Sequence, residues 1–145
     1  MSKNVKLKRG LSINLLGEAD KVYSSVKSHK YFALKPTDFH NLTPKLSVKI
    51  GDKVKSGSVV FFDKYNDKIN FCSPVSGEVT DIVRGAKRKI LEVLINAEEE
   101  IKYVSFPVLK STDLSREQII DNMLKGGVWP FIRQKPYDII ANPTD

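Results

Sequence analysis

The chain has 145 residues, 41% apolar and 28% charged, which is the composition of a globular protein and excludes a wholly disordered one. Its longest apolar runs, residues 58–62 and 90–95, are too short to span a bilayer, and its first residues lack the apolar stretch of a secretory signal. The single cysteine, Cys72, excludes an internal disulfide and fits a reducing compartment. The length predicts one domain, or one domain with an appendage.

The charge balance is basic, with 24 lysines and arginines against 17 acids and a net charge of +7. Such an excess fits a nucleic acid, an anionic membrane surface, an acidic partner protein, or solubility alone. The cations gather in two clusters, Lys3, Lys6, Lys8 and Arg9 at the start and Arg84, Lys87, Arg88 and Lys89 further on. Neither cluster is interleaved with aromatic residues, and no helix-turn-helix or zinc-finger spacing is visible, so nucleic acid is the weakest of these interpretations.

In chain order, residues 1–16 alternate loosely between apolar and polar side chains and predict two short strands around the Arg9-Gly10 break. Residues 18–44 are polar and irregular apart from the run at residues 31–34, so we expect a long loop with one short strand. Pro36 and Pro44 exclude a regular central strand there, because proline donates no backbone hydrogen bond.

Residues 45–95 carry the clearest pattern of the chain. Short β-rich runs alternate with turn residues, and they predict strands over residues 45–50, 59–62, 68–72, 78–83 and 89–95. The turns fall at Gly51, at Gly57, around residues 65–67, at residues 74–77 and at Gly85. Many short strands with a turn every few residues indicate a small, twisted β sandwich or barrel.

The pattern changes to a helical period after residue 111. Ser115 and Gln118 have the spacing of a capping box, the apolar residues that follow lie on one helical face, and Gly126-Gly127 ends the helix. The last 17 residues are unusually apolar, with Trp129, Phe131, Ile132, Tyr137, Ile139 and Ile140. Because natural termini are usually polar, we expect this arm to dock, either on polypeptide outside this chain, as in a fragment of a longer protein, or back on its own β-body.

The glycine-rich turns point to a known architecture. Residues 48–57 and 73–79, with the Gly51-Asp52 turn in the first and the Pro74 to Gly77 turn in the second, resemble the barrel-sandwich hybrid of biotinyl- and lipoyl-carrier domains. In a carrier, the hairpin between these segments presents the modified lysine at its tip. Here the predicted tip is Asn66-Asp67, flanked but not occupied by Lys64 and Lys68, which favours the carrier fold and opposes the carrier function.

A longer resemblance covers the whole chain. It is carried by residues 6–11, 35–37, 48–55, 62–64, 73–77, 84–88 and 127–137, among which Arg84-Gly85-Ala86-Lys87-Arg88 and the Trp129-Pro130 segment with Arg133, Pro136 and Tyr137 are the most specific. By these motifs the chain resembles the N-terminal part of the NqrA family, whose members are subunits of the sodium-translocating NADH:quinone reductase. Two departures stand out: residues 38–45 look like an inserted loop, and family members run to several hundred residues.

The resemblance implies a mainly β (α+β) fold with one or two helices. A barrel-sandwich domain would cover residues 1–110, and residues 111–145 would form a helix and an apolar arm leading into domains absent from this chain. It also implies a peripheral subunit on the cytoplasmic face of the bacterial inner membrane, within a complex that oxidises NADH, reduces quinone and exports sodium. Quinone would be the substrate, while NADH, flavins and iron–sulfur centres would belong to partner subunits, with no cofactor in this chain. The alternative is a stand-alone lipoyl- or biotinyl-like module without the modified lysine.

Two sets of residues are candidates for function. A quinone site needs flat apolar walls and one or two hydrogen-bond donors, and the family-like positions of Tyr31, Phe32, Lys35, Phe131 and Arg133 offer both. The alternative is that Trp129, Phe131 and Ile132 are core anchors for domains absent from this chain. The second set, Arg84, Lys87, Arg88 and Lys89, is expected to form a docking patch on a partner or a membrane surface. His29 and His40 lack ligand spacing, so no metal site is expected, and Cys72 is interpreted as a small buried apolar residue.

Overall fold

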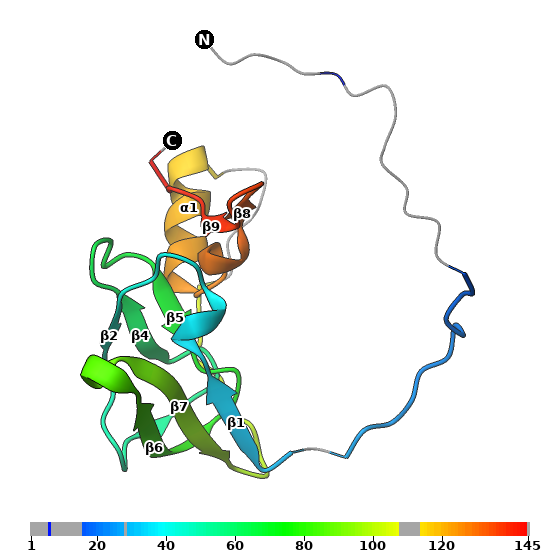
Figure 1. Ribbon diagram of the computed structural model, residues 1–145, viewed down its shortest axis with the longest axis vertical. Helices are drawn as coiled ribbons and strands as arrows, with labels where there is room; N and C mark the ends of the chain where they lie inside the picture. The colour runs from blue at the N-terminus through cyan, green and yellow to red at the C-terminus, as the bar shows by residue number, and fades with distance from the viewer. Residues whose placement is uncertain (1–5, 7–15, 28, 108–113, 145) are drawn as a thin grey trace.

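The computed structural model describes residue 6 and residues 16–27, 29–107 and 114–144. The two strands expected in residues 1–16 fall in the part of the chain outside these ranges. From Tyr31 onward the described chain forms a β-body, and a helix and a small hairpin cover one end of it (Figure 1).

Two antiparallel sheets make up the β-body. The first contains, in spatial order, β1 (Tyr31–Leu34), β7 (Ile90–Ala97), β6 (Gly77–Arg84) and β3 (Lys53–Val54). The second contains β2 (Pro44–Leu46), β4 (Val59–Asp63) and β5 (Asn70–Cys72). The arrangement confirms the expectation of many short strands joined by tight turns. β2 begins at Pro44 and is an edge strand, which is where a proline is tolerated.

The long β6–β7 hairpin holds the first sheet together. Val79 lies opposite Ile95 and Ile82 opposite Val93, so its inward positions meet across the pair. Gly77, at the start of β6, has no room for a side chain, because a Cβ atom there would stand 2.0 Å from the backbone oxygen of Asn96 in β7. Because that neighbour is backbone, only glycine fits at this position of the strand pair.

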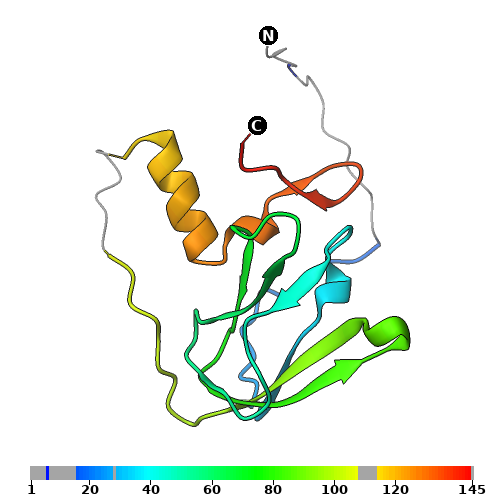
Figure 2. The ribbon, with the colours of Figure 1, turned by 90° about the vertical axis from the view of Figure 1, so that its left-hand side faces the viewer.

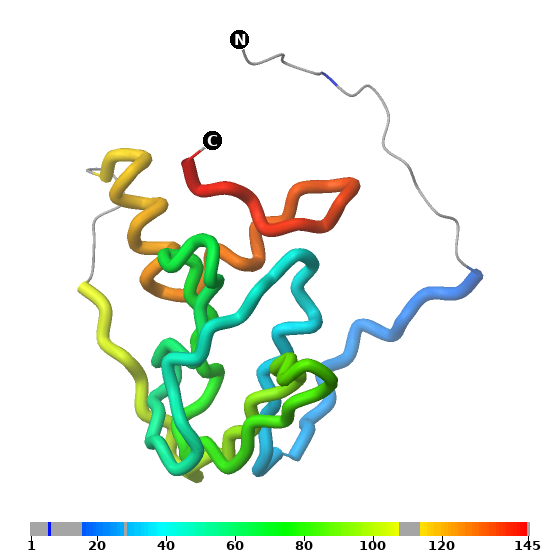
Figure 3. The backbone as a smooth tube through the Cα atoms, turned by 60° about the vertical axis from the view of Figure 1, so that its left-hand side comes forward, coloured from blue at the N-terminus to red at the C-terminus, as the bar shows by residue number. Residues whose placement is uncertain are grey.

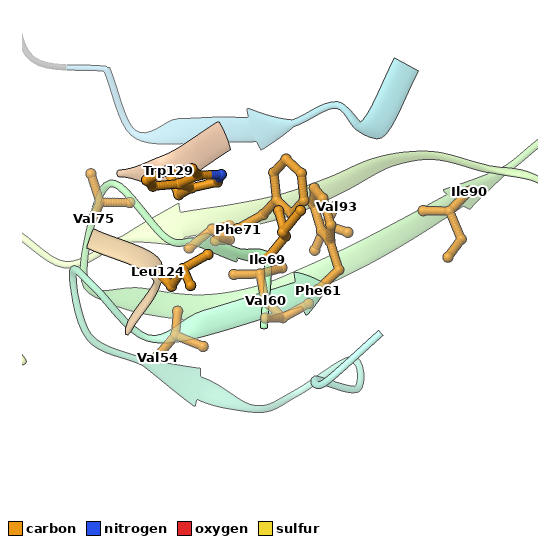
Figure 4. Packing of buried hydrophobic residues seen from close by; sticks show 12 residues of the cluster. Val54, Val60, Phe61, Ile69, Phe71, Val75, Ile90, Val93, Leu124 and Trp129 are labelled. Carbon is orange, nitrogen blue, oxygen red and sulfur yellow. The ribbon is translucent and has the colours of Figure 1, made fainter. Parts of the chain in front are cut away.

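The core lies between the sheets and continues under the C-terminal segment. Val60, Phe61 and Val79 are fully buried, and the rings of Phe61 and Phe71 stack at 4.7 Å between centroids. Leu124 and Trp129 belong to the same buried cluster, as Figure 4 shows. The aliphatic and aromatic side chains that give the strands their sequence pattern therefore form one continuous apolar interior with the segment that follows the sheets.

The predicted strand at residues 45–50 is too long. The strand ends at Leu46, its last hydrogen bond to β4 runs from Ser47 N to Val60 O (2.9 Å), and Ile50 is 60% exposed. The chain turns early because Asp52 accepts a hydrogen bond from the Lys49 backbone nitrogen (2.8 Å), which closes a tight turn before the alternation of the sequence ends.

The β4–β5 turn lies where the sequence predicts it. Two turns follow each other and share Asn66, closed by Asn66 N to Asp63 O (3.2 Å) and Ile69 N to Asn66 O (3.0 Å). Because β4 ends at Asp63 and β5 begins at Asn70, the middle of the loop falls at Asn66 and Asp67. Lys64 and Lys68 flank this tip on either side, as expected.

The helix prediction is confirmed. α1 (Arg116–Lys125) begins after Ser115, whose hydroxyl accepts from Gln118 N (3.3 Å) while Gln118 Oε1 accepts from Ser115 N (2.9 Å). This reciprocal pair is the capping box that the spacing predicts. Leu124 is the buried residue of the helix and joins it to the core.

The apolar arm packs back on the body. After α1, the short helix η4 (Trp129–Phe131) buries Trp129, and the indole nitrogen donates to the Ala141 carbonyl at 2.8 Å. The arm then forms a hairpin of β8 (Arg133–Gln134) and β9 (Ile139–Ile140). A parallel bridge between His40 and Ile139 ties this hairpin to the loop after β1, and Figure 3 shows the two segments running close together.

Candidate functional site

A pocket of about 230 Å³ opens between the two sheets, where the edge strand β1 faces the edge strand β5. Among the described residues β1 pairs only with β7 and β5 only with β4, so the sandwich is open along this seam. Ala33 and Leu34 supply one wall, Phe61 and Cys72 the other, and Phe131 of the C-terminal segment covers the end. The pocket is lined mainly by apolar groups, which is typical of sites for small molecules.

Phe39 occupies the centre of an aromatic cluster at this pocket. Its ring meets Phe71 edge-on at 4.7 Å between centroids and Phe131 at 6.2 Å. The Arg133 guanidinium lies over the same ring, 4.6 Å from its centroid. Phe39 therefore joins the β-body to the C-terminal segment and gives the pocket a flat aromatic wall.

Lys35 supplies a cation at the rim of the pocket. Its ammonium pairs with the Glu92 carboxylate of β7 at 3.3 Å, and both side chains are partly exposed. Asp38, at the end of the short helix η1 (Pro36–Asp38), adds a carboxylate to the same rim. The rim thus combines one donor and one acceptor group around an apolar interior.

Arg133 is held by protein acceptors on every nitrogen. Nε donates to Pro130 O (3.1 Å), Nη1 to both the backbone and the carboxylate of Asp138 (3.2 Å each), and Nη2 to Asp38 O (3.3 Å). The side chain is 20% exposed. These bonds hold the β8–β9 hairpin against η1. The main structural role of Arg133 is therefore to connect two segments that are 95 residues apart in the sequence.

The carboxylate of Asp138 completes this link. It also accepts from Lys135, and this hydrogen bond, with the charges of Lys135, Arg133 and His40, lowers the pKa of Asp138 below its ordinary value of 3.8. The charged form of Asp138 is the one that the hairpin stabilises.

The five quinone candidates do not all come together. Lys35 and Phe131 line the pocket, and Arg133 reaches it through its contact with Phe39. Tyr31, at the start of β1, is 61% exposed and lies outside it. Phe32 is half-buried and lines a second pocket of about 340 Å³, whose apolar walls include Val75, Ala97 and Ile101.

Two pocket residues are not predicted by the sequence reasoning. Phe39 lies in the stretch that looks like an inserted loop, and its only signal is that it is the one aromatic residue among its polar neighbours. Cys72 is only partly buried and its thiol lines the pocket; burial raises its pKa, which keeps it protonated. Gly127 lies against it, since a Cβ at that glycine, which has φ +68°, would stand 2.5 Å from the Cys72 sulfur.

The expected docking patch lies at the far end of the β6–β7 hairpin, which reaches out to one side of the body (Figure 2). Its four cationic residues, Arg84, Lys87, Arg88 and Lys89, are all exposed. The structure thus gathers them at one turn, in and beside the short helix η2 (Ala86–Arg88), as the sequence predicts. What the patch binds stays a prediction.

Within the described ranges, no group of three or more His, Cys, Asp and Glu side chains is arranged to hold a metal ion. In the same part of the chain, no helix has both the length and the apolar character that a membrane span requires.

Two antiparallel sheets enclosing one core, with glycine-bearing turns between short strands, define a barrel-sandwich hybrid domain followed by a helix and a hairpin. The model of the NqrA N-terminal barrel-sandwich hybrid domain matches residues 5–98, and that of the NqrA second alpha/beta domain matches residues 114–145. The chain belongs to the NqrA family.

The relatives of the chain bear a common name. It is 33% identical, over 96% of its length, to the NqrA subunit of the Na(+)-translocating NADH-quinone reductase of Pseudomonas aeruginosa. It is 34% identical over 94% of its length to the corresponding subunit from Psychromonas ingrahamii, and 33% identical over 92% to the one from Vibrio vulnificus. The chain spans about a third of the length of these relatives, 32%, 31% and 30% respectively.

Proposed function

We propose that the chain works as part of the NqrA subunit of a sodium-translocating NADH:quinone reductase, peripheral on the cytoplasmic face of the membrane. The observation that carries this proposal is the similarity to such subunits along 96% of the chain. Its partners are the other subunits of the complex, which hold the flavins and iron–sulfur centres and oxidise NADH. Co-purification tests the proposal: the tagged protein brings down NADH:quinone reductase activity from membranes, and recovery without that activity contradicts it.

Within the complex, we propose that the pocket between β1 and β5 receives the quinone ring. Supporting this are its aromatic wall at Phe39 and Phe131, its apolar interior, and the Lys35 ammonium at its rim, which can donate to a quinone carbonyl. Every Arg133 nitrogen donates to a protein acceptor, whereas the Lys35 ammonium has three donors and its pair with Glu92 uses one of them. Lys35 is therefore the stronger donor candidate, and Arg133 acts by holding the wall.

Three variants of the complex test the quinone site. Replacing Phe131 or Lys35 with alanine raises the quinone KM while NADH oxidation with an artificial electron acceptor persists. The matched control is Tyr31→Ala, since Tyr31 is an exposed aromatic residue outside the pocket. If Tyr31→Ala changes the quinone KM as much as Phe131→Ala, or if all three variants lose both activities, the pocket is not the quinone site.

We also propose that the chain carries no biotin, lipoate or flavin covalently. Asn66 and Asp67 stand at the hairpin tip, where a carrier has its modified lysine, and Lys68 beside them lines a pocket with Arg116, Ile120 and Leu124 of α1. The helix therefore lies beside the position that a carrier must leave accessible to its modifying enzyme. The intact mass of the purified protein tests this: it equals the mass of the polypeptide, and an addition on Lys64 or Lys68 would establish the carrier alternative.

A further inference from the structure

The turn between β6 and β7 carries four exposed cationic residues that do not line the proposed quinone pocket: Arg84, Lys87, Arg88 and Lys89. No acidic residue occurs between Asp81 and Glu92, and the Glu92 carboxylate is already paired with Lys35. Positive charge at this turn is therefore uncompensated along the hairpin, and it is concentrated at the outermost point of a projecting element (Figure 2).

The backbone fixes two of these cations side by side. Lys87 (φ 53°) and Arg88 (φ 61°) both adopt the left-handed conformation, which long side chains rarely adopt and which asparagine and glycine favour. Hydrogen bonds from Gly85 N to Lys89 O (2.8 Å) and from Arg84 Nη1 to Arg88 O (3.3 Å) close the turn around them. The sequence thus keeps long cationic side chains at positions where the backbone favours smaller residues.

The chemistry of the turn fits a layer of anionic headgroups better than a protein surface. Protein interfaces are built around buried aromatic and aliphatic anchors, and lysine is depleted in them. Here Ala86 is the only apolar residue among residues 84–89, and the nearest apolar residues are engaged, because Ile90 is buried and Leu91 lies over Gly85. A bilayer surface requires only exposed cations, each of which strengthens binding about fivefold.

We propose that the β6–β7 turn binds the phosphate headgroups of an anionic bilayer and so orients this domain against the membrane surface. The proposal rests on the proposed function, in which the chain is part of a membrane-bound complex. The attraction weakens as salt rises, because charges at a surface are screened over about 8–10 Å at physiological ionic strength.

Co-sedimentation with vesicles tests the proposal. The chain is mixed with vesicles of phosphatidylcholine alone, or with vesicles of phosphatidylcholine and phosphatidylglycerol, whose headgroup is anionic. We expect binding only to the anionic vesicles, and a loss of at least about 25-fold in the double variant Lys87→Glu/Arg88→Glu, since two attractions are removed. Circular dichroism verifies that the variant is folded.

The matched control is Lys49→Glu/Lys55→Glu, which changes the net charge by the same amount at two exposed lysines in the loops around β3. Equal losses in the two double variants would mean that overall charge, not the turn, drives binding, and no binding to anionic vesicles would overturn the proposal outright. Release by inorganic phosphate, but not by chloride of equal ionic strength, would show a site for free phosphate instead. If the chain co-purifies with the reductase but does not bind anionic vesicles, this inference is refuted and the proposed function is not.

Discussion

Trp129 is the anchor that holds the C-terminal arm on the β-body, and replacing it with phenylalanine measures that anchoring. The indole is 7% exposed and donates to the Ala141 carbonyl at 2.8 Å. Phenylalanine keeps the aromatic ring but loses the hydrogen bond, worth about 1 kcal/mol, and roughly 40 Å² of buried apolar surface, worth about 1 kcal/mol more. We therefore expect the free energy of unfolding to fall by about 2 kcal/mol.

Thermal and urea unfolding measure this loss. They are followed by circular dichroism and not by tryptophan fluorescence, because the variant lacks the only tryptophan of the chain. A loss of that size lowers the melting temperature by about 4–8 °C in a chain of this length. Tyr137→Ala is the control, because Tyr137 lies on the same arm and is 76% exposed, so that its removal should cost under about 0.5 kcal/mol. If Trp129→Phe costs no more than the control, Trp129 does not anchor the arm in this chain and the reasoning is wrong.

Three further predictions concern single contacts. Gly77→Ala forces β6 away from the Asn96 carbonyl and should cost more than about 3 kcal/mol, measured by urea unfolding; a wild-type midpoint would show that the strands can separate freely. Ser115→Ala removes the capping box and should cost about 1 kcal/mol, whereas Ser115→Asn should restore most of it; equal losses would contradict the cap. Because the folded pKa of Asp138 is lowered, its contribution to stability is complete above its ordinary pKa of 3.8 and is lost as the pH falls through the lowered value. Urea midpoints between pH 2 and 6, a range chosen to bracket roughly that titration, should therefore fall less steeply on acidification in Asp138→Asn, and unchanged steepness would refute the assignment.

The elements that the sequence predicts well are those fixed by local chemistry. The helix after Ser115 and the β6–β7 hairpin follow from capping spacing and alternating side chains, and neither depends on distant residues. The predicted strand at residues 45–50 is too long because the alternation of the sequence continues into a turn closed by Asp52. Local pattern gives the existence of an element more reliably than its end.

The candidate site is harder to predict because it is assembled from distant segments. The sequence singles out the residues at positions 35 and 131, but Phe39, which lines the same pocket and contacts Phe131, lies in a stretch that looks like an inserted loop. Tyr31 and Phe32 are candidates because they are aromatic residues at family-like positions, but Tyr31 is exposed and Phe32 lines a different pocket. No periodicity within a single segment encodes a contact between η1 and a hairpin 95 residues away.

The divided construction of the pocket has a thermodynamic consequence. Its walls come from the sheets, but Gly127 and Phe131 come from the C-terminal segment that Trp129 and Arg133 fasten in place. A molecule filling the pocket would touch both parts, so it would bind the fastened arrangement and not an arrangement in which the segment has come away. Binding of a molecule in the pocket and attachment of the C-terminal segment to the β-body are then coupled. A change that weakens the attachment weakens binding, and binding strengthens the attachment by the same coupling free energy.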